Sequence, residues 1–176
     1  MELAGTLTTL RPWRQADAPA LVQHANNPNV ARQLRDRFPH PYTNADARSF
    51  IQAVAPVRPA TTFAIVAGGE AVGCVGFSPG ADVERYSAEI GYWIGETYWG
   101  RGITVEAVRL LSAYAFDTCS MLRLFALPFA DNMQSVRVLE KAGYTREAIL
   151  RSSSVKNGVV RDQALYALVN DQWRGV

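Results

Sequence analysis

The chain has 176 residues, of which 48% are hydrophobic and 19% are charged, and its formal net charge is +2. These values are typical of one globular domain with a full hydrophobic core, and they exclude a disordered chain. A charge this small does not favour binding to nucleic acid or to an anionic membrane. A membrane helix needs about 20 apolar residues in a row, and no stretch of this sequence approaches that length. We therefore expect a single domain over residues 1–176, located in the cytoplasm, with neither nucleic acid nor membrane as a partner.

The first third of the chain predicts one strand and two helices. Residues 5–13 alternate between polar and apolar side chains, as a strand does. Asp17 is a candidate N-cap for a helix over 18–26, and a second helix is predicted over 45–55. Between the two helices, the proline- and aromatic-rich residues 35–43 predict a structured loop.

The middle of the chain predicts a hairpin, a third strand and the longest helix. Residues 61–67 and 71–77 flank a glycine turn and form the predicted hairpin. Residues 87–94 predict the next strand. The helical periodicity over 102–120 is the longest in the sequence.

The last third predicts a strand over 123–128, a helix over 132–143 and two final strands, 144–155 and 159–170. An Asn-Gly pair between the final strands is a strong hairpin signal. Only the strands that flank the long helix need to be parallel. The order predicts an α+β fold: a mixed, mostly antiparallel central sheet of about seven strands with one parallel βαβ crossover, flanked by about four helices.

Gly100 and Gly102 lie on either side of Arg101, directly before the long helix. Two interpretations are open, because glycines permit a simple turn, or they keep the backbone bare so that an anion can reach the free N–H groups of a helix N-terminus. The G-x-G pattern alone favours the turn. A dinucleotide fingerprint would need a third glycine where Val105 stands, and no P-loop pattern is present, so both nucleotide motifs are excluded.

Two stretches carry a resemblance to a known family: AEIGYWIGETYWGRGITVEAV and, further along, ADNMQSVRVLEKAGYTREA. Together, in this order and spacing, they resemble the GNAT superfamily of acetyl-CoA-dependent N-acetyltransferases, and within it the branch of ribosomal-protein N-terminal acetyltransferases. The resemblance covers nearly the whole chain. It implies acetyl-CoA as the co-substrate, no metal, and acetyl transfer to a primary amine, either a protein or peptide N-terminus or a small molecule.

The resemblance also implies where coenzyme A binds. The pyrophosphate is expected on the backbone amides of the glycine turn, which are those of Trp99, Gly100, Arg101, Gly102, Ile103 and Thr104. The pantetheine arm is expected on the backbone of Tyr92, Trp93 and Ile94, with Asn132 bonding it from the other side. Thr104 departs from the family, which usually has alanine or glycine there.

Glu89 is the candidate general base, because acetyl transfer needs an unprotonated amine and desolvation among apolar neighbours favours a proton-accepting carboxylate. The alternative is that Glu89 is an ordinary exposed strand residue. Glu84 and Glu96 are weaker candidates that fit a loop surface. The oxyanion is expected at a backbone N–H of Trp93 or Ile94.

The acid that protonates the leaving thiolate departs from the family pattern. Many members have a tyrosine where this chain has Leu139. Ser135, one helical turn beyond Asn132, is the candidate substitute, and its alternative is an ordinary serine at a helix N-terminus. Tyr144 fits the hydrophobic core better than a catalytic role.

Two functional hypotheses remain open from the sequence, an N-acetyltransferase and a non-catalytic acyl-CoA-binding sensor module. The absent tyrosine favours the sensor, whereas Glu89, Asn132 and Ser135 favour the enzyme. A homodimer is expected from the resemblance and from the long apolar final strands. The remaining reactive side chains are expected to be structural, because none has a partner at metal-ligand, disulfide or triad spacing: Cys74, Cys119, His24 and His40.

Overall fold

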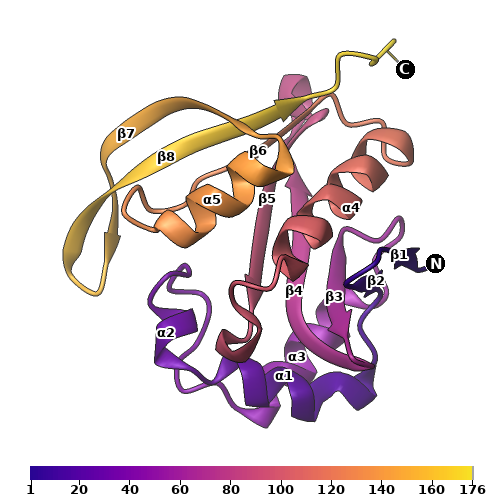
Figure 1. Cartoon of the computed structure of the whole chain (residues 1–176), viewed down its shortest axis with the longest axis vertical. Helices are drawn as coiled ribbons and strands as arrows, with labels where there is room; N and C mark the ends of the chain where they lie inside the picture. The colour runs from indigo at the N-terminus through magenta and orange to yellow at the C-terminus, as the bar shows by residue number, and fades with distance from the viewer. Residues whose placement is uncertain (176) are drawn as a thin grey trace. The chain divides into compact units, whose positions relative to one another are not determined.

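Eight strands form the sheet in the order β1-β2-β3-β4-β5-β6-β8-β7 (Figure 1). The computed structural model describes residues 1–175. The strands are β1 (Leu3–Ala4), β2 (Thr9–Arg11), β3 (Thr62–Ala67), β4 (Glu70–Pro79), β5 (Ser87–Ile94), β6 (Arg123–Ala126), β7 (Thr145–Lys156) and β8 (Val159–Val169). The pair β5–β6 is parallel, and the pairs β1–β2, β2–β3, β3–β4, β6–β8 and β7–β8 are antiparallel, which confirms the predicted mixed sheet.

The helices lie between the strands in the predicted chain order. They are α1 (Ala18–Ala25), α2 (Pro28–Ala31), α3 (Asn44–Val54), α4 (Ile103–Asp117) and α5 (Met133–Ala142), with short 3₁₀ helices η1 (Gln15–Asp17), η2 (Asp82–Glu84) and η3 (Glu96–Tyr98). Four of these are the predicted helices. The fifth, α2, is a single turn that begins at a proline and is capped by the Asn27 side chain, which accepts the N–H of Asn29.

The first strand differs from the prediction. Residues 5–13 were expected to form one strand, but the chain turns back at Gly5–Thr8, where the Gly5 N–H donates to the Thr8 carbonyl over 2.8 Å. Only residues 9–11 of the expected strand join the sheet, as β2, and the turn brings residues 3–4 beside them as the additional strand β1, which is why the sheet has eight strands rather than about seven.

The hairpin β7–β8 confirms its turn signal. Asn157 and Gly158 both have positive φ, 52° and 77°, as the two central residues of a type I′ turn require. The two strands form the long orange and yellow hairpin of Figure 1.

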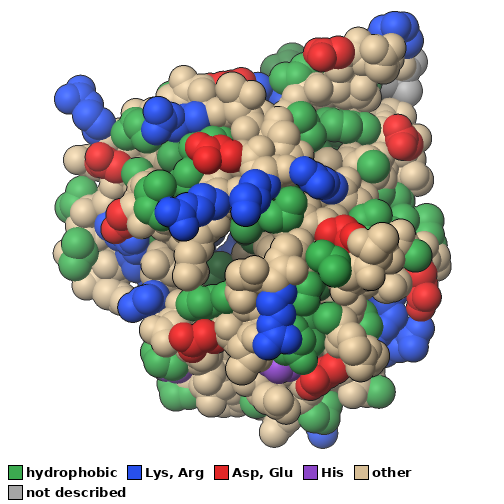
Figure 2. Space-filling model, in the orientation of Figure 1, with side chains coloured by type: hydrophobic (Ala, Val, Ile, Leu, Met, Phe, Trp, Pro, Cys, Tyr) green, Lys and Arg blue, Asp and Glu red, His purple; other side chains and the backbone are tan. Residues whose placement is uncertain are grey.

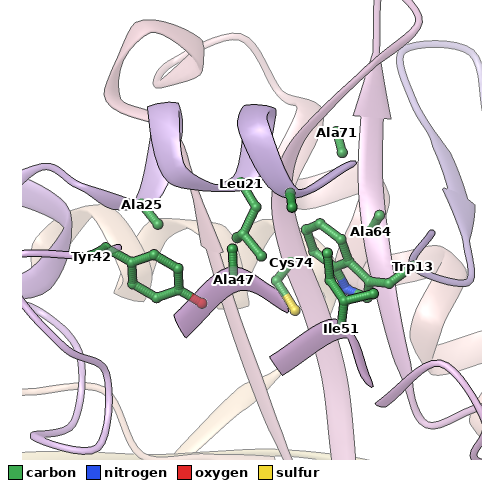
Figure 3. Packing of buried hydrophobic residues seen from close by; sticks show 10 residues of the cluster. Trp13, Leu21, Ala25, Tyr42, Ala47, Ile51, Ala64, Ala71 and Cys74 are labelled. Carbon is green, nitrogen blue, oxygen red and sulfur yellow. The ribbon is translucent and has the colours of Figure 1, made fainter. Parts of the chain in front are cut away.

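The residues divide into two compact units, of which the first comprises Met1–Gly76 and Tyr92–Leu110. Its core lies where α1 and α3 pack on β3 and β4 (Figure 3). Leu21 and Ile51 are fully buried there, and the edge of the Trp13 ring packs on Phe50 at 5.6 Å between centroids.

Asp17 stands at the predicted N-cap position of α1, but its side chain bonds other groups. It precedes α1, but its carboxylate makes no cap hydrogen bond to that helix. The carboxylate accepts hydrogen bonds from the two terminal guanidinium nitrogens of Arg11, at 2.7 and 2.8 Å, and from the Arg14 N–H, at 2.9 Å. The charged donor of a buried arginine is a stronger partner than a helix N–H, and it takes the carboxylate away from the cap.

The second unit comprises Phe77–Gly91 and the chain from Leu111 onward. In it, α5 packs on β8, with Leu139 fully buried and the Tyr166 hydroxyl donating to Glu140 over 2.9 Å. Tyr144 belongs to this core as predicted: its hydroxyl lies 2.9 Å from the Ser112 hydroxyl, and burial raises its pKa to about 12.

Within residues 1–175, none of the helices has the length and apolar character needed to cross a membrane. Acidic side chains are interspersed with basic ones on the face shown in Figure 2.

Candidate active site

The glycine turn connects η3 to α4. Gly100 and Gly102 have φ of 75° and 80°, a conformation that L-residues rarely adopt. The first backbone bond at the start of α4 runs from the Glu106 N–H to the Gly102 carbonyl over 3.1 Å. The N–H groups of residues 103–105 therefore have no acceptor within the helix, and they point out of its positive end.

The space beside this turn is open. A Cβ atom built on Gly100 would meet no atom of the described residues within 4 Å. Free N–H groups, a bare backbone and open space together fit a phosphate group. Thr104, the departure from the family pattern, is half-buried in the first turn of α4.

Two side chains of the turn fold back on the protein. The Trp99 indole N–H donates to the Ile94 carbonyl over 2.9 Å, which fastens the turn to the end of β5. The exposed Arg101 guanidinium lies over the Tyr98 ring, 5.3 Å from its centroid. Arg101 therefore keeps its charge beside the turn.

The last residues of β5 are closely packed. A Cβ atom on Gly73 of β4 would lie 2.4 Å from the Trp93 carbonyl oxygen, so only glycine allows this approach. The Gly95 N–H donates to the Val72 carbonyl over 2.8 Å. Phe38, from the loop between α2 and α3, meets the half-buried Trp93 ring edge-on, with 5.6 Å between centroids.

Glu96 has more partners than the sequence indicates. Its carboxylate accepts hydrogen bonds from the side-chain amide of Asn27, at 2.7 Å, and from that of Asn29, at 2.9 and 3.1 Å. These bonds lower the pKa of Glu96. It anchors η3 rather than lying on a free loop surface. No sequence signal could have shown this, because the partners are 67 and 69 residues away.

Glu106, in the first turn of α4, is a second carboxylate that sequence reasoning missed. It accepts hydrogen bonds from three consecutive residues of the β1–β2 turn, Thr6, Leu7 and Thr8. These residues are about 100 positions away in the chain, so again no local pattern indicates the contact.

In the second unit, Glu89 is half-buried on β5, opposite Phe125 of β6 in the parallel register. Gly91, two residues on, shares the same face of the strand. A Cβ atom on Gly91 would meet no described atom within 4 Å, so there is open space beside Glu89 on that face.

Asn132 and Ser135 are brought together at the N-terminus of α5. The Asn132 side-chain oxygen accepts the Ser135 N–H over 3.2 Å and caps the helix. The cap uses the oxygen, which leaves the side-chain nitrogen as the Asn132 group that could donate to a ligand. Both side chains are half-buried, whereas Leu139 is fully buried and faces the core.

Two of the reactive side chains outside this set, His24 and Cys74, have structural surroundings. His24 is buried, with Nε2 3.3 Å from a Glu70 carboxylate oxygen and its ring edge-on to Tyr98. Cys74 is a free thiol in the core, and burial raises its pKa to about 12. Among residues 1–175 the structure shows no group of three side chains placed to hold a metal ion.

The sequence of this chain matches a known protein family. Residues 8–145, which are 138 of the 176, match the Acetyltransferase (GNAT) domain family. The chain belongs to the GNAT acetyltransferase family. It is an acetyl-CoA-dependent N-acetyltransferase, which passes the acetyl group of acetyl-CoA to an amine. Of the two hypotheses from the sequence, the enzyme is the one confirmed.

The relatives match different shares of the chain. An uncharacterised N-acetyltransferase of Bacillus licheniformis, p20, is 30% identical over 173 residues, which are 95% of each chain. The ribosomal-protein-serine acetyltransferase of Escherichia coli (strain K12) is 30% identical over 112 residues, covering 64% of this chain and 62% of that one.

A solved structure shows the same fold. RimL, described as a ribosomal L7/L12 α-N-protein acetyltransferase in complex with coenzyme A, aligns with a TM-score of 0.86 at 22% identity. The alignment covers 97% of this chain and 99% of RimL. The predicted GNAT-like fold is therefore confirmed.

Proposed function

We propose that this acetyltransferase acetylates the N-terminal amine of a protein or peptide in the cytoplasm, and that residues 1–176 act as one catalytic domain. The observation that carries the site is the glycine turn, where unpaired N–H groups of α4 meet a bare backbone and open space. The acceptor class is supported by the names of two relatives, the ribosomal-protein-serine acetyltransferase and RimL.

Coenzyme A is held in this proposal by backbone groups. The diphosphate accepts hydrogen bonds from the amides of residues 99–104, because the helix dipole and the free N–H groups favour an anion there. The pantetheine arm bonds the backbone of residues 92–94. Asn132 donates its side-chain N–H group to the same arm, since the helix cap already engages its oxygen.

Glu89 is the general base in this proposal. It takes the proton of the ammonium group, directly or through water, and the neutral amine attacks the thioester carbonyl. The open space beside Gly91 gives the amine room next to the carboxylate. The negative charge that develops on the carbonyl oxygen is stabilised by the backbone N–H of Trp93 or Ile94.

Ser135 passes to the leaving thiolate the proton that the attacking nitrogen gives up as it becomes an amide, so that the C–S bond breaks, coenzyme A departs as a thiol and the serine hydroxyl is restored. Leu139 has no proton to give and is buried in the core. Ser135 is instead fixed at the start of α5 by its bond to Asn132, next to the group that would hold the pantetheine arm.

An acceptor panel tests the proposed function. Acetyl-CoA is mixed with short peptides with a free N-terminus, the same peptides with a blocked N-terminus, and small amines, and free thiol is measured. We expect release with free peptides only, and mass spectrometry to place the acetyl group on the α-amine. Turnover of small amines at a higher kcat/KM than any peptide would contradict the proposal.

We also propose a homodimer that uses the β7–β8 hairpin. Val155, Val159 and Val160 on this hairpin are 60–61% exposed, which is unusual for three neighbouring valines. β7 is also a terminal strand of the sheet, so its outer edge has backbone groups available for pairing.

A further inference from the structure

Glu106 lies in the first turn of α4, and its two oxygens accept four hydrogen bonds. The Thr6 N–H and hydroxyl donate to Oε1 over 2.8 and 2.7 Å, and the N–H groups of Leu7 and Thr8 donate to Oε2, both over 2.8 Å. Burial raises the pKa of Glu106, but these bonds outweigh it and the pKa is lowered. The carboxylate is therefore ionised at neutral pH.

The β1–β2 turn is shaped to meet this carboxylate. A Cβ atom on Gly5 would lie 2.4 Å from a Glu106 oxygen, so any larger residue here would displace the carboxylate. On the other side, the Leu7 side chain lies against the glycine turn, 3.3 Å from where a Cβ atom on Gly102 would be. The turn at 5–8 thus touches both Glu106 and the backbone just before α4.

A negative charge on Glu106 would weaken the binding of an anion at the N-terminus of α4. An acidic side chain in the first turn stabilises a helix, but it repels a diphosphate bound at the same end. An uncharged residue would avoid that repulsion. The four bonds show instead what the charge does: it ties the start of α4 to β1 and β2, and through β2 to β3.

We propose that Glu106 is a positioning residue for the coenzyme A diphosphate, which holds the glycine turn in its binding shape by clamping the N-terminus of α4 to the turn at residues 5–8. This inference rests on the proposed binding of the diphosphate by the glycine turn. Glu106 acts through the backbone of the turn and does not touch the ligand itself.

The direction in which one substitution changes the affinity for coenzyme A shows whether Glu106 positions the turn or is only a nearby charge. Glu106→Gln keeps the size of the side chain and removes its charge. If Glu106 were only a nearby charge, coenzyme A would bind more tightly, because a repulsion is lost. If it positions the turn, binding weakens, because an amide has one acceptor oxygen and its NH₂ group faces N–H donors.

We expect Glu106→Gln to raise the Kd for coenzyme A, measured by calorimetry, and the KM for acetyl-CoA by roughly tenfold or more. The kcat at saturating acetyl-CoA should change little, since the catalytic side chains are untouched. Asp117→Asn is the matched control, because it removes an exposed carboxylate from the last turn of the same helix. It should leave both constants at wild-type values.

A second variant reaches the same clamp without changing any charge. Gly5→Ala places a methyl group on the Glu106 carboxylate and pushes it out of position, so it should also raise the KM for acetyl-CoA. If Glu106→Gln does not fold, Gly5→Ala and Thr6→Val, which removes only the hydroxyl donor, decide the question. Wild-type KM values in both would overturn the proposal.

The outcome also distinguishes this inference from the one on which it rests. Wild-type or tighter binding in Glu106→Gln, together with weak binding in Gly100→Ala, would refute the positioning role and leave the diphosphate site in place. Wild-type binding in both variants would refute the diphosphate site itself.

Discussion

Glu89 is the side chain on which the proposed chemistry depends most. Its neighbour Gly91 leaves open space on the same face of β5, so a substrate amine could approach the carboxylate. Glu89→Gln keeps the shape and removes the basicity. We expect kcat to fall by about 10²- to 10⁴-fold, or roughly 3 to 5.5 kcal/mol, with the Kd for acetyl-CoA unchanged.

The pH dependence gives a second readout for Glu89. The deficit of the variant should shrink as pH rises, because an amine that is already neutral needs no base. Glu84→Gln is a suitable control, since Glu84 is an exposed carboxylate of η2 in the same unit. A Glu89→Gln enzyme with wild-type turnover at pH 7 would show that the residue is only part of the strand.

The buried pair of Arg11 and Asp17 predicts a pH-dependent stability. Burial alone raises the pKa of Asp17, but the bonds from Arg11 and the Arg14 N–H outweigh it and lower the pKa. The pair therefore contributes stability above the ordinary carboxyl pKa of about 4, and this contribution is lost as pH falls through the lower folded value.

Asp17→Asn leaves the Arg11 charge buried without its partner and should cost about 3 kcal/mol at pH 7. Urea unfolding at pH 7 and at pH 3 measures the difference. The gap between the wild type and the variant should be smaller at the lower pH, because below the ordinary carboxyl pKa part of the stability that the ionised carboxylate contributes is lost. A gap of equal size at both values of pH would mean that the ion pair is not its cause.

At the scale of elements, the turn between η3 and α4 can be tested by a matched pair of glycines. Gly100 and Gly69 have φ of 75° and 85°, and in both cases a Cβ atom would meet no described atom within 4 Å. Alanine at either position should therefore lower the free energy of unfolding by a similar amount, roughly 1–2 kcal/mol, because of backbone strain. Only Gly100→Ala should weaken the binding of acetyl-CoA, because Gly69 lies in the β3–β4 hairpin.

The measurement is the shift in thermal unfolding caused by the ligand. Acetyl-CoA at a hundredfold excess over Kd should stabilise the wild type and Gly69→Ala by about 2.7 kcal/mol, and Gly100→Ala much less. Equal stabilisation of all three proteins would mean that the diphosphate does not lie on this turn.

At the scale of the whole molecule, the exposed valines of the β7–β8 hairpin predict self-association. We expect light scattering to give the mass of a dimer at tens of micromolar, and Val160→Glu to give a monomer, because a charge would have to be buried in the interface. Val83→Glu introduces the same charge at an exposed valine of η2 and should leave the dimer intact. A monomeric wild type would refute the homodimer.

The sequence by itself determined the elements and their order. Periodicity and turn chemistry act over a few residues, so the strand 87–94, the long helix after it and the Asn157–Gly158 turn could all be predicted locally and are confirmed. The position of the glycine turn at the N-terminus of α4 followed from the same local rules. The family followed from two stretches in the right order.

The tertiary structure alone decided which partner each charged side chain has. Asp17 binds Arg11 rather than capping α1, and residues 5–8 form a turn that bonds Glu106, which leaves only residues 9–11 of the predicted strand in the sheet. Glu96 and Glu106 anchor the two sides of the glycine turn through partners that are 67 to 100 residues away. Such contacts depend on how the chain returns to itself in space, and no local pattern of residues encodes that path.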